Sequence, residues 1–197
     1  MGVFFSKIFS RLFNSNRERK LLLLGLDNSG KTSLLYRLKL GRVISTVPTV
    51  GFNVETLTFR NLRFAAWDLG GQSSLRLYWK SYFVDTDAVV FCVDCTDKSR
   101  FAIAKAELEA LYAEPALESV PMLVLANKQD CSDATPAGQV ASAIVGCPSN
   151  RPWSVMPTSV LTGEGIDEAF NWLCDVLGGV SSDEIINSSS GQVEVVQ

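Results

Sequence analysis

The chain has 197 residues, 47% hydrophobic and 20% charged, a length and balance that predict one globular domain with a sizeable core. Its net charge of −3 argues against the basic surface with which proteins bind nucleic acid, so no nucleic-acid partner is expected. The sequence contains no histidine, which excludes the commonest metal ligand and the usual general base near neutral pH.

The first segment, residues 2–13, reads GVFFSKIFSRLF and is unusually apolar for the start of an acidic chain. At helical spacing, one half of its surface is apolar and the other half is polar and basic. The apolar half consists of Phe4, Phe5, Ile8, Phe9, Leu12 and Phe13. Met1-Gly2 followed by Ser6 also matches the M-G-x-x-x-[ST] pattern of N-myristoylation, which makes Gly2 the expected lipidation site. A generic amphipathic helix packs on its own domain, but the acylation pattern favours residues 1–16 as a membrane-binding helix and linker.

Strands and helices alternate through residues 17–178, which form the predicted domain. The expected strands are KLLLLGL (20–26), FNVETLTF (52–59), LRFAAWDL (62–69), DAVVFCVD (87–94), VPMLVLAN (120–127) and WSVMPTS (153–159). The expected helices cover residues 31–39, 100–112, 136–145 and 165–177. Continuous apolar strands separated by helices are typical of a three-layer α/β fold, in which helices cover both faces of a mainly parallel sheet. A tight turn at Arg60–Asn61 predicts a hairpin, which adds one antiparallel edge strand to this six-stranded sheet.

The end of the chain and the cysteines carry weaker signals. Residues 179–197 are rich in Gly, Ser and acidic residues and are predicted to form a flexible polar tail. Cys92 and Cys95 form a C-x-x-C pattern, but they lie on an expected buried strand and at an odd offset, so their side chains point to opposite faces. We therefore expect Cys92 and Cys95 to be core side chains in a reducing compartment, and not a redox-active or metal-binding pair.

Residues 25–32, GLDNSGKT, match the phosphate-binding pattern G-x-x-x-x-G-K-[ST] and lie between an expected strand and an expected helix. In such a loop, successive backbone N–H groups and the helix N-terminus surround the phosphates. Lys31 then reaches the β- and γ-phosphate oxygens, and the hydroxyl of Thr32 ligates Mg²⁺.

Two later segments complete this site. At the end of the strand 62–69, Asp68 can hold Mg²⁺ through water, the Gly71 N–H can reach a γ-phosphate, and Gln72 can orient an attacking water. Thr49 lies before the hairpin, where its hydroxyl can complete the Mg²⁺ shell only when a third phosphate is present. The residues assigned to the phosphates are Asp27, Asn28, Ser29, Gly30, Lys31, Thr32, Ser33 and Gly71, and those assigned to the metal are Thr32, Thr49 and Asp68.

The N-K-x-D pattern at residues 127–130, directly after the strand 120–127, indicates which nucleotide base the site binds. A carboxylate at Asp130 accepts hydrogen bonds from both N1–H and the 2-amino group of guanine, whereas adenine lacks both donors. Lys128 lays its aliphatic stem against the purine, and Asn127 belongs to the same base site. The pattern, together with the phosphate loop, predicts a guanine nucleotide.

The segments GLDNSGKT, VPTVGFNVET, WDLGGQ and NKQD together resemble the motifs of the Arf family of small GTPases, and the similarity extends from Met1 to about Leu177. MGVFFSKIFSRLF and YWKSYF look most like the Arf-like proteins of the trans-Golgi type. The resemblance implies the Ras-like P-loop NTPase fold, with Thr49 in switch one and Gln72 as the catalytic residue that orients water. It also implies that Phe52, Trp67 and Tyr82 form the aromatic patch that binds effectors.

The chain departs from the family pattern in two places. The family's S-A-T-like base loop appears here as Ser159-Val160-Leu161, with a bulkier side chain at Val160. Leu77 stands where proline is usual in switch two. In addition, Asp27 occupies a position where Ras-like relatives commonly have glycine, and no arginine finger is evident in the chain itself. We therefore expect slow intrinsic hydrolysis, accelerated by about 10³–10⁵ when an activating protein donates an arginine.

The resemblance implies a molecular switch that binds and hydrolyses GTP, with GTP or GDP and Mg²⁺ as its ligands, in vesicle trafficking. With GDP, the N-terminal helix docks on the domain; with GTP, the hairpin slides into that groove and expels the helix into the membrane. The implied partners are an exchange factor, an activating protein, effectors such as coiled-coil golgin tethers, and the cytoplasmic face of the trans-Golgi membrane. The chain is expected to be a monomer that moves between the cytoplasm and this membrane.

Two other readings stay open. One is a nucleotide-locked membrane scaffold with negligible turnover, which Asp27 and Leu77 favour and which Gln72 and Thr49 oppose. The other is a phosphate-loop kinase or ATPase, which Asp130 opposes.

Overall fold

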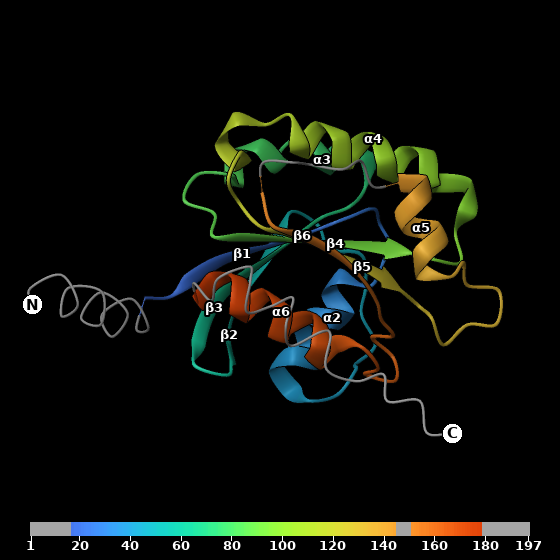
Figure 1. The fold of residues 1–197 in the computed structure, drawn as a ribbon, viewed down its shortest axis with the longest axis horizontal. Helices are drawn as coiled ribbons and strands as arrows, with labels where there is room; N and C mark the ends of the chain where they lie inside the picture. Colours follow the sequence, from blue (N-terminus) through green and yellow to red (C-terminus); the bar gives the residue numbers. More distant parts are fainter. Residues whose placement is uncertain (1–16, 145–150, 179–197) are drawn as a thin grey trace, which may run out of the picture.

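The computed structural model describes residues 17–144 and 151–178. Its centre is a six-stranded sheet with the strand order β2-β3-β1-β4-β5-β6, and Figure 1 shows this sheet between two layers of helices. The strands are β1 (Arg19–Leu24), β2 (Phe52–Phe59), β3 (Leu62–Leu69), β4 (Ala88–Asp94), β5 (Met122–Asn127) and β6 (Trp153–Pro157). The predicted three-layer α/β fold is confirmed.

The central strands are apolar because both of their faces are covered. β4 and β5 are buried along their whole length, and β1 is buried over its four leucines. These strands pair in parallel, while β2 runs antiparallel to β3 at the edge of the sheet. Arg60, in the turn between β2 and β3, has a φ of 52°, the left-handed conformation that tight hairpin turns require. The predicted hairpin is therefore confirmed.

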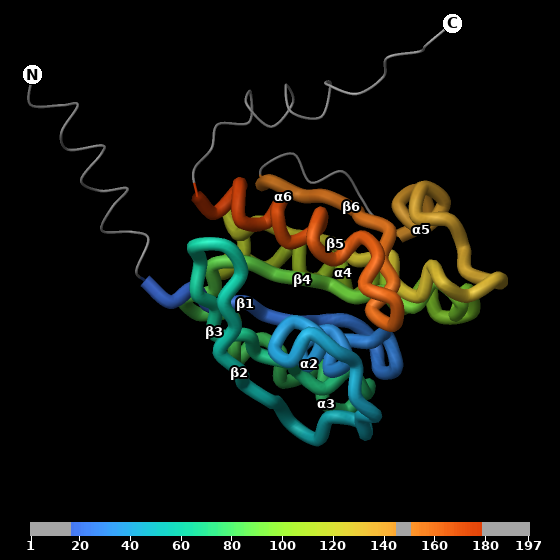
Figure 2. Tube along the Cα trace, turned by 90° about the horizontal axis from the view of Figure 1, so that it is seen from below, coloured from blue at the N-terminus to red at the C-terminus, as the bar shows by residue number. Residues whose placement is uncertain are grey.

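The helices divide between the two faces of the sheet. They are α2 (Lys31–Leu40), α4 (Phe101–Tyr112), α5 (Ala137–Ile144) and α6 (Ile166–Gly178). Figures 1 and 2 show α2 and α6 on one face and α4 and α5 on the other. Leu34 of α2 and Phe170 of α6 belong to the first core, and Leu108 of α4 and Val140 of α5 belong to the second.

The two cysteines of the C-x-x-C pattern lie in different cores, as their odd offset predicted. Cys92 packs with α2 and α6, and Cys95 packs with α4 and α5. Burial raises the pKa of Cys92 to about 12 and that of Cys95 to about 11. Both thiols therefore stay protonated near neutral pH and behave as core side chains.

The structure also contains elements that the sequence pattern did not predict. The short helix α3 (Ser73–Arg76) and a 3₁₀ helix (Trp79–Tyr82) follow Gln72. Four residues are too few to show a helical period, which explains why they were missed. The predicted N-terminal helix, Gly2 and the tail 179–197 lie outside the described residues. Within residues 17–144 and 151–178, every helix is too short or too polar to cross a bilayer.

Candidate functional site

The loops that follow β1, β3 and β5 meet at one edge of the sheet, because the carboxyl ends of parallel strands share that edge. A cleft of about 270 Å³ opens there. It is lined by Asp27, Asn28, Gly30, Lys31, Thr32, Ser33, Thr46, Val47, Pro48, Thr49, Gly71, Gln72 and Lys128. Two further residues assigned from the sequence, Ser29 and Asp68, are buried and do not line the cleft.

The phosphate loop between β1 and α2 requires its glycines. A Cβ on Gly25 would lie 2.2 Å from the carbonyl oxygen of Cys92, and a Cβ on Gly30 would lie 2.4 Å from Nδ2 of Asn127. Both glycines also have positive φ values, 134° and 96°. At these two positions the loop backbone therefore lies closer to neighbouring groups than a residue with a Cβ could. The loop leads directly into the first turn of α2.

Lys31 carries a buried positive charge at the start of α2. Its side chain is only 5% exposed, and its Nζ donates hydrogen bonds to the carbonyl oxygens of Gly25 (3.0 Å) and Leu26 (2.7 Å). Burial lowers the pKa of Lys31, and the nearby Asp68 raises it. A buried cation that donates only to neutral carbonyls is suited to an anionic ligand such as a phosphate.

Three oxygen-bearing side chains meet beside Lys31. The hydroxyl of Thr32 donates to Oδ2 of Asp68 at 2.6 Å, and the hydroxyl of Thr49 lies 2.9 Å from that of Thr32 and 3.2 Å from Oδ2 of Asp68. Oδ1 of Asp68 is buried and has no hydrogen-bond partner among the described residues. Burial raises the pKa of Asp68, while the hydrogen bond from Thr32 opposes this shift. Hydroxyl and carboxylate oxygens are the ligands that Mg²⁺ prefers, so this donor set fits that ion.

The segment after β3 lies against the phosphate loop. A Cβ on Gly71 would be 2.4 Å from the backbone nitrogen of Asp27, so only glycine permits this approach. Nε1 of Trp79 donates to the carbonyl oxygen of Gly70 at 3.0 Å and holds the segment from the other side. Gln72 is exposed in the cleft, with its side chain free of any hydrogen bond that caps α3.

The proposed base site is built by two loops that bond to each other. Asn127 is 2% exposed; its Nδ2 donates to the carbonyl oxygen of Ser29 at 2.9 Å, and its Oδ1 accepts from the Val160 N–H at 3.0 Å. The hydroxyl of Ser159 donates to Oδ1 of Asp130 at 2.5 Å and lowers the pKa of that carboxyl. Asp130 therefore stays ionised and can accept hydrogen bonds near neutral pH.

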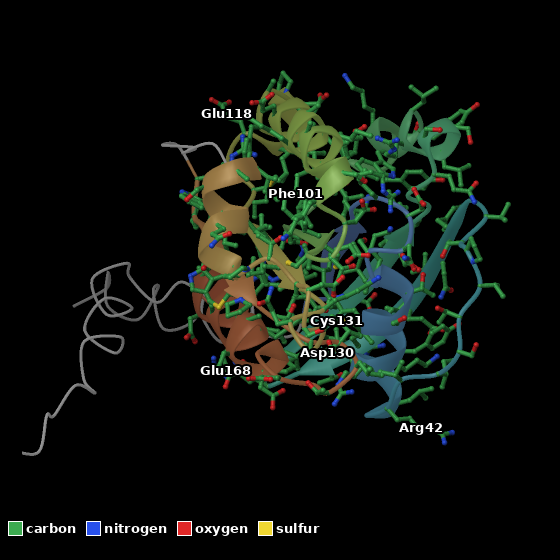
Figure 3. All side chains as sticks on the ribbon, turned by 90° about the vertical axis from the view of Figure 1, so that its right-hand side faces the viewer. Arg42, Phe101, Glu118, Asp130, Cys131 and Glu168 are labelled. Carbon is green, nitrogen blue, oxygen red and sulfur yellow. The ribbon has the colours of Figure 1, made fainter. Side chains whose placement is uncertain are left out.

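The arrangement explains how valine is accommodated at position 160. The Val160 side chain is 4% exposed and packs in the core with α2 and α6, while its N–H points the other way and donates to Oδ1 of Asn127. Lys128, with a φ of 68°, follows Asn127, and its Nζ pairs with Asp94 at 2.5 Å. Figure 3 shows Asp130 between α2 and α6, on the side of the molecule turned to the viewer.

The three aromatic residues assigned to effector binding form one cluster. The ring centroids of Phe52 and Trp67 are 5.4 Å apart, as are those of Phe52 and Tyr82, and those of Trp67 and Tyr82 are 5.8 Å apart. Phe52 is 49% exposed, so the cluster presents apolar surface to solvent. It lies between the segment before β2 and the segment after β3, both of which line the cleft. Phe52 is therefore not a core residue, although it is apolar and lies on a strand.

Arg100 is a functional candidate that the sequence did not reveal. It lies just before α4, and its Nη1 donates to Oδ1 of Asp27 at 2.9 Å while its Nη2 donates to the Asp27 carbonyl oxygen at 3.2 Å. Its Nε donates to Asp97 at 2.5 Å. The guanidinium does not line the cleft, so it is not an arginine finger; it holds the side chain of Asp27 from behind.

Replacing Arg100 by alanine is expected to weaken GTP binding by roughly threefold to tenfold, with a smaller effect on GDP. Without Arg100, the Asp27 carboxylate is uncompensated near the position of the γ-phosphate. Titration with fluorescent GTP and GDP analogues measures both affinities, and the second change Asp27→Asn should restore GTP binding. Arg63→Ala, which breaks an exposed pair with Glu18, is the control. Equal losses for both nucleotides would contradict this explanation.

Comparison with known proteins agrees with this geometry. The sequence model of the ADP-ribosylation factor family matches residues 5–177. The chain is 48% identical over 178 residues to ADP-ribosylation factor-like protein 1 of Saccharomyces cerevisiae, covering 90% of this chain and 97% of that protein. It is 44% identical over 178 residues to ADP-ribosylation factor 3 of Arabidopsis thaliana, again covering 90% and 97%. The solved structure of the Arl6 BBS3 small GTPase from Trypanosoma brucei, with bound nucleotide analogue GppNp, superposes with a TM-score of 0.76 at 29% identity, over 84% of this chain and 100% of that one.

Proposed function

Because this chain belongs to the ADP-ribosylation factor family of small GTPases, we propose that it recruits effector proteins to the trans-Golgi membrane under the control of GTP. As a member of that family, it binds GTP and GDP with Mg²⁺ and hydrolyses GTP to GDP and phosphate. The observation that carries the proposal of a switch is the meeting of Thr49, from the segment before β2, with Thr32 and Asp68. A hydroxyl from a loop distant in sequence thereby joins the nucleotide site to the hairpin.

The roles at the phosphates follow from charge and reach. Lys31 binds the β- and γ-phosphate oxygens, and the N–H groups of the phosphate loop and of Gly71 donate to them. Thr32 and Thr49 would ligate Mg²⁺ directly, and Asp68 would hold it through water. When bound, this ion neutralises phosphate charge. Gln72 orients the attacking water, because it lines the cleft directly after Gly71 and its side chain makes no hydrogen bond that caps α3.

The base site selects guanine through a carboxylate and a backbone donor. Asp130 accepts from N1–H and the 2-amino group. The Val160 N–H, which donates to Oδ1 of Asn127, is shared with the carbonyl oxygen at C6 in a three-centre hydrogen bond. Asn127 ties this loop to the phosphate loop, which supports its assignment to the base site. Lys128 covers the purine, and Ser159 orients Asp130.

The hairpin connects the nucleotide to the membrane in this proposal. Its tip packs on α6, where the rings of Phe59 and Phe170 are 5.6 Å apart and Nη1 of Arg60 lies 2.5 Å from Oδ1 of Asp175. In Figure 2 the hairpin reaches the end of α6 next to the start of β1. With the hairpin on α6 and Thr49 at the metal site, the arrangement supports the GTP-type conformation, in which the groove for the N-terminal helix is filled.

The membrane part of the proposal rests on residues outside the described part of the chain. Myristoylation at Gly2 and a helix within residues 1–16 supply a reversible anchor, since a single acyl chain binds a bilayer only marginally. Residues 179–197 remain a flexible polar tail in the proposed domain organisation. Phe52, Trp67 and Tyr82 bind effectors, including coiled-coil golgin tethers, and an exchange factor and an activating protein act on the monomeric chain.

Flotation of the full chain, myristoylated at Gly2, with liposomes tests this proposal. The protein loaded with a non-hydrolysable GTP analogue is expected to partition at least about tenfold more strongly into liposomes than the GDP form, because only its helix is free to insert. The variant Gly2→Ala should not float with either nucleotide. Equal flotation of both forms would contradict a nucleotide-controlled anchor. Microscopy of the tagged chain tests the Golgi assignment, which a plasma-membrane pattern would contradict.

A further inference from the structure

Arg37, in the second turn of α2, reaches across to the loop that carries Val160. Its Nη1 donates to the carbonyl oxygens of Val160 and Leu161, each at 3.0 Å, and its Nη2 donates to the carbonyl oxygen of Thr162 at 2.7 Å. One planar guanidinium therefore binds three consecutive carbonyls of residues more than a hundred positions later in the chain. Arginine suits this task because its N–H groups point outward in a fixed plane.

The loop is shaped to receive this side chain. A Cβ on Gly163 would lie 2.1 Å from Nη2 of Arg37, so the absent side chain of this glycine leaves the space that the guanidinium fills. Gly163 has a φ of 98°, which other residues rarely adopt. No acidic side chain among residues 17–144 and 151–178 pairs with Arg37, so within that part of the chain the loop carbonyls are its hydrogen-bond partners.

These bonds are one of two sets that hold the loop. In the other set, the Val160 N–H donates to Asn127 and the Ser159 hydroxyl donates to Asp130. Arg37 binds the carbonyl oxygens of the same short segment from α2, whose first residue is Lys31. The helix that begins at the phosphate site is thus tied directly to the loop that meets the base.

We infer that Arg37 is a positioning residue: by fixing the loop, it keeps the Val160 N–H, which also donates to Oδ1 of Asn127, where the guanine carbonyl can share it, and so slows nucleotide release. This inference rests on the proposed guanine site. It extends that site by a residue that contacts neither the base nor the phosphates. If the loop loses this anchor, the N–H to the C6 oxygen is lost first, while the Asp130 contacts to N1–H and the 2-amino group are retained.

The test compares the dissociation rates of three diphosphates from the wild-type chain and from Arg37→Ala. GDP release is expected to be about tenfold faster from the variant. In 6-thioguanosine diphosphate, sulfur replaces the C6 oxygen and is a weaker and larger acceptor, so the wild type should release it faster than GDP. For Arg37→Ala, the rates for these two nucleotides should converge. Inosine diphosphate lacks only the 2-amino group, and its rate relative to GDP should stay within about twofold of the wild-type ratio, since it reports on Asp130.

Arg42→Ala is the matched control. Arg42 is exposed just past the end of α2, points away from the domain in Figure 3, and has no hydrogen bond or ion pair within the described ranges. Its replacement should leave all three rates unchanged. Arg37→Lys should give intermediate rates, because one ammonium cannot bind three carbonyls at once. Thermal unfolding of each variant with GDP bound identifies any variant that fails to fold.

Two outcomes would overturn the inference in distinguishable ways. If Arg37→Ala keeps the wild-type ratio between GDP and its 6-thio analogue, Arg37 does not position the Val160 N–H, although the guanine site itself stands. If the wild type does not distinguish GDP from the 6-thio analogue or from inosine diphosphate, the proposed guanine site is wrong and the role of Arg37 falls with it.

Discussion

Replacing Asp130 by asparagine is expected to lower the affinity for GTP by about 10³-fold or more, one of the largest single effects in this chain. The carboxylate accepts from two donors of guanine, and the hydrogen bond from Ser159 lowers the pKa of Asp130 and keeps it ionised. An asparagine presents one acceptor and one donor at the same place. Its amide N–H₂ then faces the 2-amino group of guanine, so that a buried donor lacks an acceptor.

The same change should create affinity for xanthosine triphosphate, whose 2-position carries an oxygen that accepts from the new amide. Competition of each nucleotide against a fluorescent GDP analogue measures both effects. Asp133→Asn, an exposed aspartate three residues later, is the control and should leave the affinities unchanged. A variant that binds GTP and xanthosine triphosphate as the wild type does would show that Asp130 does not contact the base. Loss of both nucleotides would instead indicate damage to the loop.

Replacing Gln72 by leucine is expected to reduce the GTP hydrolysis that an arginine-donating activating protein stimulates by about 10³-fold or more, toward the slow intrinsic rate. Gln72 is exposed in the cleft directly after Gly71, the residue that lies against the phosphate loop. Leucine has a similar size but cannot orient a water molecule. GTP affinity should change little, because Gln72 is assigned to the water and not to the phosphates.

Single-turnover hydrolysis, with and without the catalytic domain of an Arf-type activating protein, tests this role. Gln139→Leu makes the same exchange on the exposed surface of α5 and serves as the control. If Gln72→Leu still responds fully to the activating protein, another group must orient the water. A wild-type chain that hydrolyses GTP alone as fast as with the activating protein would contradict the slow intrinsic rate that Asp27 predicts.

The elements with strong local patterns were predicted from the sequence alone. Residue composition and hydrophobic period were enough to predict β1 with its four leucines, the buried strands β4 and β5, and the hairpin of β2 and β3. The segments 73–76 and 79–82 were missed, because short helices there depend on contacts such as the bond from Trp79 to the Gly70 carbonyl. The exposure of Phe52 also needed the structure, since an apolar residue on an edge strand faces the core or the solvent according to what packs over it.

The motifs alone indicate which ligand chemistry this chain can support, whereas the packing of the domain brings together the distant residues that hold that chemistry in place. Residues 25–32 and 127–130 form contiguous motifs, and their backbone and side-chain groups act largely within one loop each. Arg100 and Asp27 are 73 positions apart, and Arg37 and Val160 are 123 apart. Such pairs carry no local period or motif. Arg37 meets Val160 because α2 and α6 pack on the same face of the sheet, and Arg100 meets Asp27 because α4 packs against Leu26 on the other face. Both placements depend on burying apolar surface along the whole domain.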